Sequence, residues 1–312
     1  MLDHLLVSVI IPNYCHSRYL DNRIQSVLNQ IYQNFEVIIL DDCSPDDGAS
    51  KAVIEKYRSN PHISHIIYNE ENGGSTFKQW EKGISLAKGE LIWIAESDDK
   101  CLDTLLEKLV GQFERNENLA LAFCKTVAFR DDGKEERLDP LPLTTNWTFG
   151  SSEFISQHMT HGCPMLNASA CLFKKDVALK IDKQYVNFRG AGDRMFWTEI
   201  SECGDVAVVN EWLNYMRFHA SNSTKRYNQN GTNQREDKQI LDYIFSKGYI
   251  TPKVYNQIRY DYVKIHIFQM VTDHKLKHDL YAYWGYSAVV QFRLKIEAWC
   301  HKFWGYLKNK AR

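Results

Sequence analysis

Three acidic side chains and a serine directly follow an apolar run in the first third of the chain. Leu91-Ile92-Trp93-Ile94-Ala95 has the composition of a buried strand, and Glu96-Ser97-Asp98-Asp99 ends it. Adjacent carboxylates are costly to bury without a partner, so they belong at the strand end, facing solvent or a cation. In an open α/β sheet that edge is where ligands bind. Asp98 and Asp99 offer hard oxygens that suit Mg²⁺ or Mn²⁺ shared with the phosphates of a ligand.

A second acidic pair, Asp41-Asp42, follows another apolar run at 35–40. Either pair alone has a structural explanation, because Asp is common where a strand ends and a helix N-cap follows. Two apolar runs that both end in paired carboxylates are harder to explain in this way. Both pairs are expected on one rim of one sheet, and this coincidence favours a ligand site there.

The elements that would place these acids on one rim can be recognised in the sequence. Continuous apolar runs predict strands, and apolar residues at three- and four-residue spacing predict helices between them. The expected strands cover 5–11, 35–40, 63–68 and 91–95, and the expected helices cover 18–31, a segment after the turn at 44–48, 75–87 and 102–113. Pro12 and Asn13 are expected to end the first strand, since proline cannot donate to a ladder. The alternation predicts a mostly parallel α/β sheet covered on both faces.

The pattern changes in the second half of the chain. Residues 119–129, 206–209 and 213–218 have β character, and 130–170 are rich in loops. The polar stretch 220–235 is expected to be a mobile loop, and the chain from Asp237 onward is expected to be helical. We therefore expect an α/β domain over 1–225, with halves at about 1–115 and 116–225, followed by a helical region over 226–312.

Composition narrows the class of protein. The 312 residues carry a formal net charge of −1, so no overall field attracts nucleic acid. None of the eight cysteines forms a Cys-x-x-Cys pair, which favours reduced thiols. We see no signal peptide, and no apolar window approaches the roughly 18 residues of a membrane span. These features predict a cytoplasmic protein that does not bind nucleic acid.

Four motifs, taken in order, resemble family 2 of the glycosyltransferases, which has the GT-A fold. They are Val7-Ser8-Val9-Ile10-Ile11-Pro12-Asn13-Tyr14, Val37-Ile38-Ile39-Leu40-Asp41-Asp42, Gly89-Glu90-Leu91-Ile92-Trp93 and Ser97-Asp98-Asp99. Their order and spacing fit the family along residues 5–220. The resemblance implies a Rossmann-like, mostly parallel sheet flanked by helices, here with a C-terminal helical extension. It also implies transfer of a sugar from a nucleotide-sugar donor with inversion at the anomeric carbon.

The resemblance implies which residues hold the donor. In the family, the start of the loop after the first strand and the aspartate after the second strand hold the base, and here these are Pro12 and Asp42. The uracil ring offers an N3–H donor to a carboxylate, whereas N3 of cytosine is an acceptor, so Asp42 favours UDP. The other residues assigned to the nucleotide-sugar pocket are Asn13, Tyr14, Asp41, Gly74, Ser97 and Asp98.

The resemblance also implies a metal site and a general base. Asp98 and Asp99 match the Asp-x-Asp-type motif that holds the diphosphate through Mn²⁺ or Mg²⁺, with Asp99 as the most direct ligand. Several members have a His near the end of the domain that completes the metal site, and His219 resembles it. Asp193, in Gly192-Asp193 ahead of Met195-Phe196-Trp197, resembles the base that takes the acceptor proton, although it also suits a helix N-cap.

The chain departs from the family pattern at three places. Cys43 replaces a glycine, and Lys78-Gln79-Trp80 stands where an Ala-Arg-Asn run is usual in the donor-binding loop. The Gln-x-x-Arg-Trp motif of processive synthases is missing, since Gln234-Arg235-Glu236 does not supply it. We therefore expect single additions to a glycan or lipid-linked acceptor in polysaccharide assembly.

Two other classes of function remain open. A nucleotidyltransferase also uses a doubly wound sheet with metal-holding acids, but a glycine-rich, basic loop is expected after its first strand, and here that loop is Pro12-Asn13-Tyr14-Cys15-His16-Ser17-Arg18. A nucleotide-sugar-binding protein without activity is the other alternative, and the intact acidic set argues against it.

The C-terminal segment 287–311 has apolar residues at helical spacing, and together with Arg312 it carries a local net charge of +5. Such a basic, aromatic-rich helix can lie on an anionic membrane surface, which would bring the active site to a lipid-linked acceptor at the inner face of the membrane. The alternative is that its apolar face packs on the catalytic domain or on a second subunit of a homodimer.

Overall fold

The computed structural model describes residues 5–218 and 223–286. They fall into two compact units. The first comprises the chain up to Phe188 together with Gly192–Asn222, and the second comprises Arg189–Ala191 together with the chain from Ser223 onward. His219 and the amphipathic segment 287–311 lie outside the described residues, so their predicted roles stay predictions.

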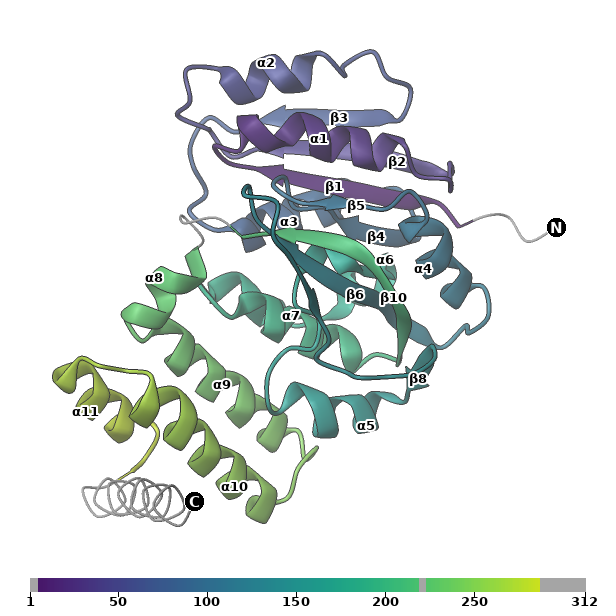
Figure 1. Cartoon of the computed structure of the whole chain (residues 1–312). Coiled ribbons are helices and arrows are strands. Elements are labelled where there is room, and N and C mark those ends of the chain that lie inside the picture. Colours follow the sequence, from purple (N-terminus) through teal and green to yellow (C-terminus); the bar gives the residue numbers. More distant parts are fainter. Residues whose placement is uncertain (1–4, 219–222, 287–312) are drawn as a thin grey trace, which may run out of the picture. The chain divides into compact units, whose positions relative to one another are not determined.

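A ten-stranded sheet in the order β3-β2-β1-β4-β9-β6-β10-β5 forms the centre of the first unit (Figure 1). The four N-terminal strands are parallel, and β9 enters antiparallel between β4 and β6. Two further strands, β7 and β8, pair with β6 and β10. The strands are β1 Val7–Asn13, β2 Phe35–Asp41, β3 Ile63–Tyr68, β4 Leu91–Ile94, β5 Lys100–Cys101, β6 Leu119–Phe129, β7 Glu135–Leu138, β8 Trp147–Phe149, β9 Cys171–Lys174 and β10 Asp205–Arg217.

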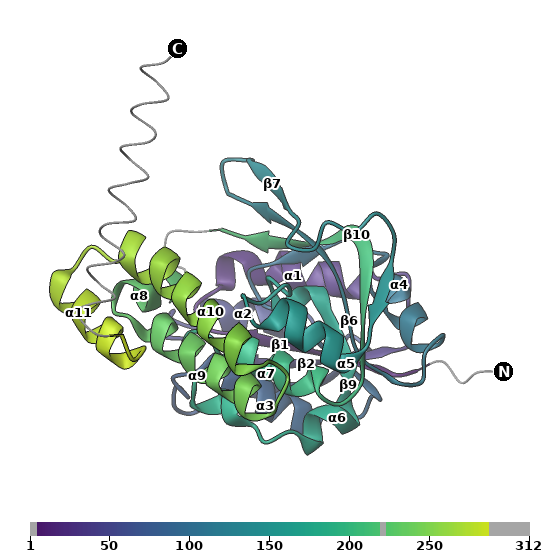
Figure 2. The ribbon, with the colours of Figure 1, turned by 90° about the horizontal axis from the view of Figure 1, so that it is seen from below.

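Helices cover both faces of this sheet, as the continuous apolar strands predict (Figure 2). The crossovers through α1 and α2 run one way along the sheet and the crossover through α3 runs back, so α3 lies on the opposite face. There it packs with α6 and the 3₁₀ segment η3. The helices of this unit are α1 Ser17–Leu28, α2 Ala49–Glu55, α3 Thr76–Leu86, α4 Leu105–Phe113, α5 Ser151–Phe154, α6 Lys175–Lys180 and α7 Gly192–Ser201, with short segments η1 Ile155–Met159, η2 Ala168–Ala170 and η3 Gln184–Asn187.

The second unit is helical. Its elements are α8 Ser223–Gln229, α9 Thr232–Ser246, α10 Pro252–Tyr262, η4 Val263–Gln269 and α11 His274–Tyr283. Its core includes the fully buried Trp284, which stacks on Tyr262 at 4.3 Å and donates from its indole N–H to the Gln234 carbonyl. Within residues 5–218 and 223–286, no helix is long and apolar enough to cross a bilayer.

Several expectations about elements and their boundaries are wrong, among them the end of the helix expected over 18–31, which lies at Leu28. The first strand continues through Pro12 and Asn13, where it still pairs with β2. Its pairing with β4 ends earlier, at Ile10. Beyond that point β1 has a neighbour only on its β2 side, so the missing N–H of Pro12 removes no bond towards β4. Most of the polar stretch 220–235 is also not a loop, since α8 covers Ser223–Gln229 and α9 begins at Thr232.

A buried carboxylate joins the first two strands to the turn that leads into β4. Glu36 of β2 accepts a hydrogen bond from the Ser8 hydroxyl at 2.6 Å and another from the Lys88 backbone N–H at 2.6 Å. The next residue, Gly89, donates its N–H to the Ser8 hydroxyl at 2.8 Å. A Cβ on Gly89 would lie 2.5 Å from the Leu6 carbonyl oxygen. Only glycine therefore lets this turn approach β1 closely enough to begin β4 in register.

Candidate active site

Strand register brings the two acidic pairs to the same edge of the sheet. Asn13, the last residue of β1, pairs with Asp41 of β2, and Ile10 pairs with Ile94 of β4. Because these strands are parallel, the loops after them leave from one edge. That edge is where a doubly wound sheet binds its ligands.

The two carboxylates after β2 have different partners. Asp41 accepts bonds from the Asn13 amide at 2.7 Å and from the Ser44 backbone N–H and hydroxyl at 3.0 and 2.7 Å. The Asn13 amide also donates to the Ser50 hydroxyl at 3.0 Å. These contacts tie the loop after β1 to the loop after β2, and next to them Tyr14 is 46% exposed. Asp41 and Asn13 therefore shape the loops of the predicted base pocket, and Tyr14 is the exposed residue that follows Asn13.

Asp42 is buried, and one of its oxygens gathers three donors. Its Oδ1 accepts from the Asn69 amide at 2.7 Å, the Gly73 backbone N–H at 2.9 Å and the Gln79 amide at 2.7 Å. None of the described residues gives Oδ2 a hydrogen bond. In the same loop, the backbone N–H of Gly74 donates to the Asn72 side chain at 2.7 Å. The loop after β3 therefore closes on Asp42 and leaves one carboxylate oxygen for a ligand.

The departure from the family pattern at Lys78-Gln79-Trp80 has a structural counterpart. The Gln79 amide bonds Asp42, and the Trp80 indole N–H donates to Glu96 Oε1 at 2.9 Å. One turn of α3 thus contacts an acid after β2 and an acid after β4. The sequence pattern marks this segment as unusual but does not show which acids it contacts.

Asp99 is held from the opposite half of the sheet. Its Oδ2 accepts from the Ser169 hydroxyl at 2.8 Å, and its Oδ1 accepts from the Arg217 backbone N–H at 3.0 Å. The same Ser169 hydroxyl accepts from the Glu96 backbone N–H at 3.0 Å. Ser97, also buried, lies 2.9 Å from Nδ1 of His16 through its hydroxyl. Sequence reasoning missed Ser169 and Arg217, because each lies 70 or more residues from the motif it orients.

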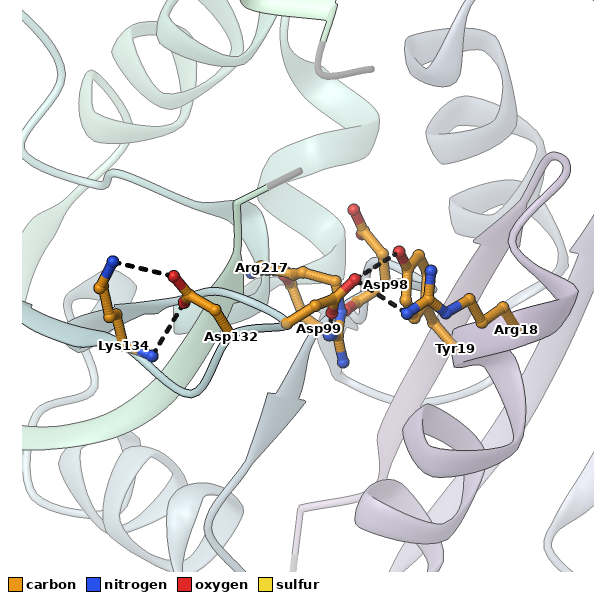
Figure 3. A network of polar contacts seen from close by, with 8 residues as sticks. Arg18, Tyr19, Asp98, Asp99, Asp132, Lys134 and Arg217 are labelled. Carbon is orange, nitrogen blue, oxygen red and sulfur yellow. Dashed lines mark hydrogen bonds and ion pairs between the residues drawn. The ribbon is translucent and has the colours of Figure 1, made fainter. Parts of the chain in front are cut away.

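Arg217 is one of the residues of the polar network drawn in Figure 3. Its Nε donates to the Asp98 carbonyl at 2.9 Å, and its guanidinium also pairs with Asp131. The guanidinium carbon lies 4.2 Å from the Tyr19 ring centroid and 4.4 Å from that of Phe129. Packing between two rings removes most of the freedom of a long side chain. Arg217 therefore fixes the backbone of the acidic motif.

The carboxylates after β4 repel one another electrostatically. Burial, together with the charges of Asp98 and Asp99, raises the pKa of Glu96 to about 8. Burial and the neighbouring Asp98 also raise the pKa of Asp99, and the buried Arg23 guanidinium opposes both shifts. A bound cation would reverse this effect, because it favours the ionised carboxylates. The cluster has the electrostatic character of a cation site.

The donor set suits Mg²⁺ or Mn²⁺ shared with a phosphate ligand. Within residues 5–218 and 223–286, no three His, Cys, Asp or Glu side chains gather closely enough to enclose a metal ion alone. Such ions are commonly held by one or two carboxylates and complete their shell with phosphate oxygens and water. Asp98 and Asp99 provide that number of carboxylates, so the residues present fit the ion.

Asp193 stands in the first turn of α7, where its Oδ1 accepts from the Arg194 backbone N–H at 2.7 Å. Arg194 itself is buried and donates to the Met159 carbonyl. The pKa of the Cys171 thiol is raised. Burial is the largest cause, two other cysteines follow, and the charge of the Asp193 carboxylate adds to them. Cys171 follows Ser169 by two residues and begins β9 beside β4. The charge of Asp193 therefore acts on a residue of the chain segment that holds Asp99.

The sequence of this chain is similar to sequences of known proteins. The sequence model described as "Glycosyl transferase family 2" matches residues 8–181. The Bacillus subtilis protein TuaG, named as a glycosyltransferase of teichuronic acid biosynthesis, is 33% identical over 128 residues, which cover 41% of this chain and 49% of TuaG. The matched region thus spans about half the length of that relative.

Solved structures share the fold. TarS from S. aureus superposes with a TM-score of 0.65 at 16% identity, over 90% of this chain and 80% of the TarS chain. It has also been crystallised in complex with UDP-GlcNAc. Mannosyltransferase PcManGT from Pyrobaculum calidifontis, in complex with GDP-Man and Mn²⁺, has a TM-score of 0.60 at 13% identity, over 94% of this chain and 79% of PcManGT. These likenesses confirm the expected GT-A fold class.

Proposed function

The chain belongs to glycosyltransferase family 2, and on this basis we propose that it is an inverting, non-processive enzyme that uses a UDP-sugar. The acceptor in this proposal is a hydroxyl group of a glycan or of a lipid-linked glycan in polysaccharide biosynthesis. The observation that carries the proposal is the meeting of Asp42 with Asp98 and Asp99 on one sheet edge. The name of TuaG, a protein of teichuronic acid biosynthesis, supports the acceptor class.

The donor base would bind at Asp42. Its Oδ1 is committed to three protein donors, so Oδ2 remains to accept the N3–H of uracil. The complex of TarS with UDP-GlcNAc supports a uridine donor. Guanine carries an N1–H donor that could take the same place, and PcManGT was crystallised with GDP-Man, so GDP is a necessary competitor in any test.

The diphosphate would lie at Asp98 and Asp99. A divalent metal bound there would neutralise the negative charge that develops on the leaving phosphate. The protein's contribution is to hold the carboxylates in place. Ser169 and the Arg217 N–H orient the two oxygens of Asp99, and the Arg217 side chain holds the Asp98 carbonyl. The Mn²⁺ in the PcManGT complex supports this part of the proposal.

The acceptor hydroxyl is a weak nucleophile and must lose its proton during attack. Asp193 is our candidate for the group that takes it. As an ionised carboxylate in the first turn of a helix it is stabilised by the positive end of the helix dipole. Inversion requires this base on the face of the sugar opposite to the leaving diphosphate, which is a requirement that a donor complex can check.

The experiment is a donor screen with a readout of released product. The protein is incubated with UDP-, GDP- and CDP-sugars and Mn²⁺, with and without lipid-linked and free glycan acceptors. Release of UDP and formation of a glycosylated product with inverted anomeric configuration supports the proposal. A parallel incubation contains UTP and a sugar phosphate, and release of pyrophosphate there would indicate a nucleotidyltransferase. Tight UDP binding without turnover would indicate a binding protein.

A further inference from the structure

A single buried carboxylate of the helical unit holds three consecutive backbone amides. Glu236, on α9, is 8% exposed. Its Oε1 accepts from the N–H of Arg189 at 2.7 Å, and its Oε2 accepts from the N–H groups of Gly190 and Ala191 at 2.9 and 2.7 Å. These amides are 45 to 47 residues away in the chain. Arg189–Ala191 belongs to the same compact unit as α9.

The three amides and the carboxylate form a specific fit. A Cβ on Gly190 would lie 1.8 Å from Oδ1 of Asn233 on α9, so this position accepts only glycine while Asn233 stays in place. Asn233 is fixed in turn, because its amide donates to the Asn228 side chain at 2.7 Å. The helix itself is anchored by the Trp284 indole, which bonds the Gln234 carbonyl. The segment is therefore seated on a rigid surface.

The hydrogen bonds from these three backbone amides to the Glu236 carboxylate are charge-assisted. Hydrogen bonds from backbone amides to an ionised carboxylate are roughly twice as strong as neutral ones. Removing the charge would leave up to three buried backbone donors poorly paired, which is unfavourable. A segment held in this way has one backbone conformation. Helix α7 begins at the next residue, Gly192, and Asp193 follows.

We propose that Glu236 is a positioning residue for Asp193. It fixes the backbone of 189–191, and thereby the entry into α7 and the direction in which the Asp193 carboxylate leaves the helix. This inference rests on the proposed function, in which Asp193 takes the acceptor proton. Small displacements of a catalytic base are costly in rate, and a misplacement of about 1 Å can cost about a hundredfold.

The test compares Glu236→Gln with Asp237→Asn in the full-length chain. Asp237 is the next residue of α9 and accepts from the Tyr262 hydroxyl at 2.5 Å, so its variant removes one charge from the same helix. Amide hydrogen exchange measures directly how firmly Glu236 holds the backbone N–H groups of 189–191. In Glu236→Gln, protection of the amides of 189–191 should fall by about tenfold or more, and in Asp237→Asn it should not change.

Turnover separates positioning from stability. With the best donor of the screen and Mn²⁺, Glu236→Gln should release UDP about tenfold to a hundredfold more slowly at saturation, while its Kd for UDP stays within about twofold of the wild type. Asp237→Asn should keep both values. Wild-type turnover in Glu236→Gln, or an equal loss in both variants, would overturn the proposal. Loss of UDP affinity in step with turnover would do the same.

A second pair of variants keeps the test decisive if Glu236→Gln does not fold. Gly190→Ala should lower turnover without loss of UDP affinity, and adding Asn233→Ala should restore part of it by removing the clash. Failure of this rescue, or loss of folding in Gly190→Ala as well, would contradict a positioning role. If the wild type releases no UDP from any donor, the proposed function fails, and amide exchange still reports whether Glu236 holds the segment.

Discussion

At the scale of single residues, hydrogen bonds to both of its oxygens hold the Asp99 side chain in place. Both of its oxygens already accept one protein hydrogen bond in fixed directions. We expect Asp99→Asn to lose most activity and to weaken UDP binding in the presence of Mn²⁺, because the amide removes an anionic ligand while keeping the shape. Calorimetric titration of UDP with Mn²⁺ or with EDTA measures this. Equal UDP affinity in EDTA and in Mn²⁺ for the wild type would contradict a role for the metal in donor binding.

Asp42→Ala tests base recognition. The substitution removes the acceptor for uracil, so the apparent dissociation constant of the donor should rise far more than turnover at saturation falls. Because Asp42 also receives the Asn69, Gly73 and Gln79 donors, Asp42→Asn is the matched variant that keeps a carbonyl acceptor for some of them. Unchanged UDP affinity with reduced turnover in both variants would exclude base reading by this residue.

Asp193→Asn tests the general base. Asn remains a good residue at a helix N-terminus, so the variant should fold, but it cannot accept the acceptor proton. Turnover should fall by about 10²–10⁴-fold with UDP affinity unchanged. A steady-state rate close to that of the wild type would leave only the helix-capping role for this side chain.

The acids of the site could be predicted from the sequence, but the residues that orient them could not. The two acidic pairs stand next to recognisable strands, so their shared edge follows from local pattern and parallel topology. The donors that orient them do not follow in this way. Ser169 and Arg217 reach Asp99 across 70 and 118 residues, and no local pattern distinguishes them from other polar residues in loop and strand. The assignments of these acids to donor, metal and base, like those of Pro12, Ser97 and His219, remain predictions.

At the scale of elements, the hydrogen bonds of Glu36 connect β1, β2 and the turn before β4, and substitution of Glu36 tests how much they stabilise the fold. Burial raises the pKa of Glu36, but the bonds from Ser8 and Lys88 outweigh burial and leave it lowered overall. A lowered carboxyl pKa contributes stability that is present above the unfolded value of about 4.3 and is lost as the pH falls through the folded value.

Glu36→Gln should therefore destabilise the protein by roughly 1–3 kcal/mol at neutral pH. The difference from the wild type should shrink below a pH of about 4, where the wild-type carboxyl is also protonated. Thermal unfolding followed by circular dichroism between pH 3 and 8 gives the comparison. Tyr32→Phe, which removes a hydroxyl that donates to the Leu5 carbonyl just before β1, controls for the loss of a polar contact in this region. A difference between wild type and Glu36→Gln that is constant with pH would contradict an ionic contribution.

Elements with long apolar runs were predictable and short or polar ones were not. The strands β1 to β4 and β6 each contain a continuous apolar stretch, and the structure confirms all five. The two-residue β5 and the exposed β7 carry no such signal, because their pairing comes from neighbours on β10 and β6. The two runs at 206–209 and 213–218 form one strand, β10, since register shifts after Val209 carry it past the polar residues between them.

At the scale of the whole molecule, the acids after β4 couple folding to pH and to ligand. The pKa of Glu96 is raised to about 8 and that of Asp99 is raised as well, so the folded protein without metal binds protons that the unfolded chain releases near pH 4. Where the folded state binds more protons than the unfolded state, stability falls as the pH rises. This loss is expected between a pH of about 4 and about 8.

In EDTA, the melting temperature should therefore decline from pH 6 to pH 8. Glu96→Gln should reduce the decline, because it removes one of the carboxyl groups with a raised pKa while its amide oxygen can still accept from Trp80. Mn²⁺ with UDP should raise the melting temperature more at pH 8 than at pH 6, because protons compete with the cation for the same carboxylates. Differential scanning calorimetry at fixed UDP and Mn²⁺ concentrations measures both effects. A melting temperature in EDTA that is independent of pH from 6 to 8, or a ligand effect that is larger at pH 6, would mean that these carboxylates are not the groups that bind the cation.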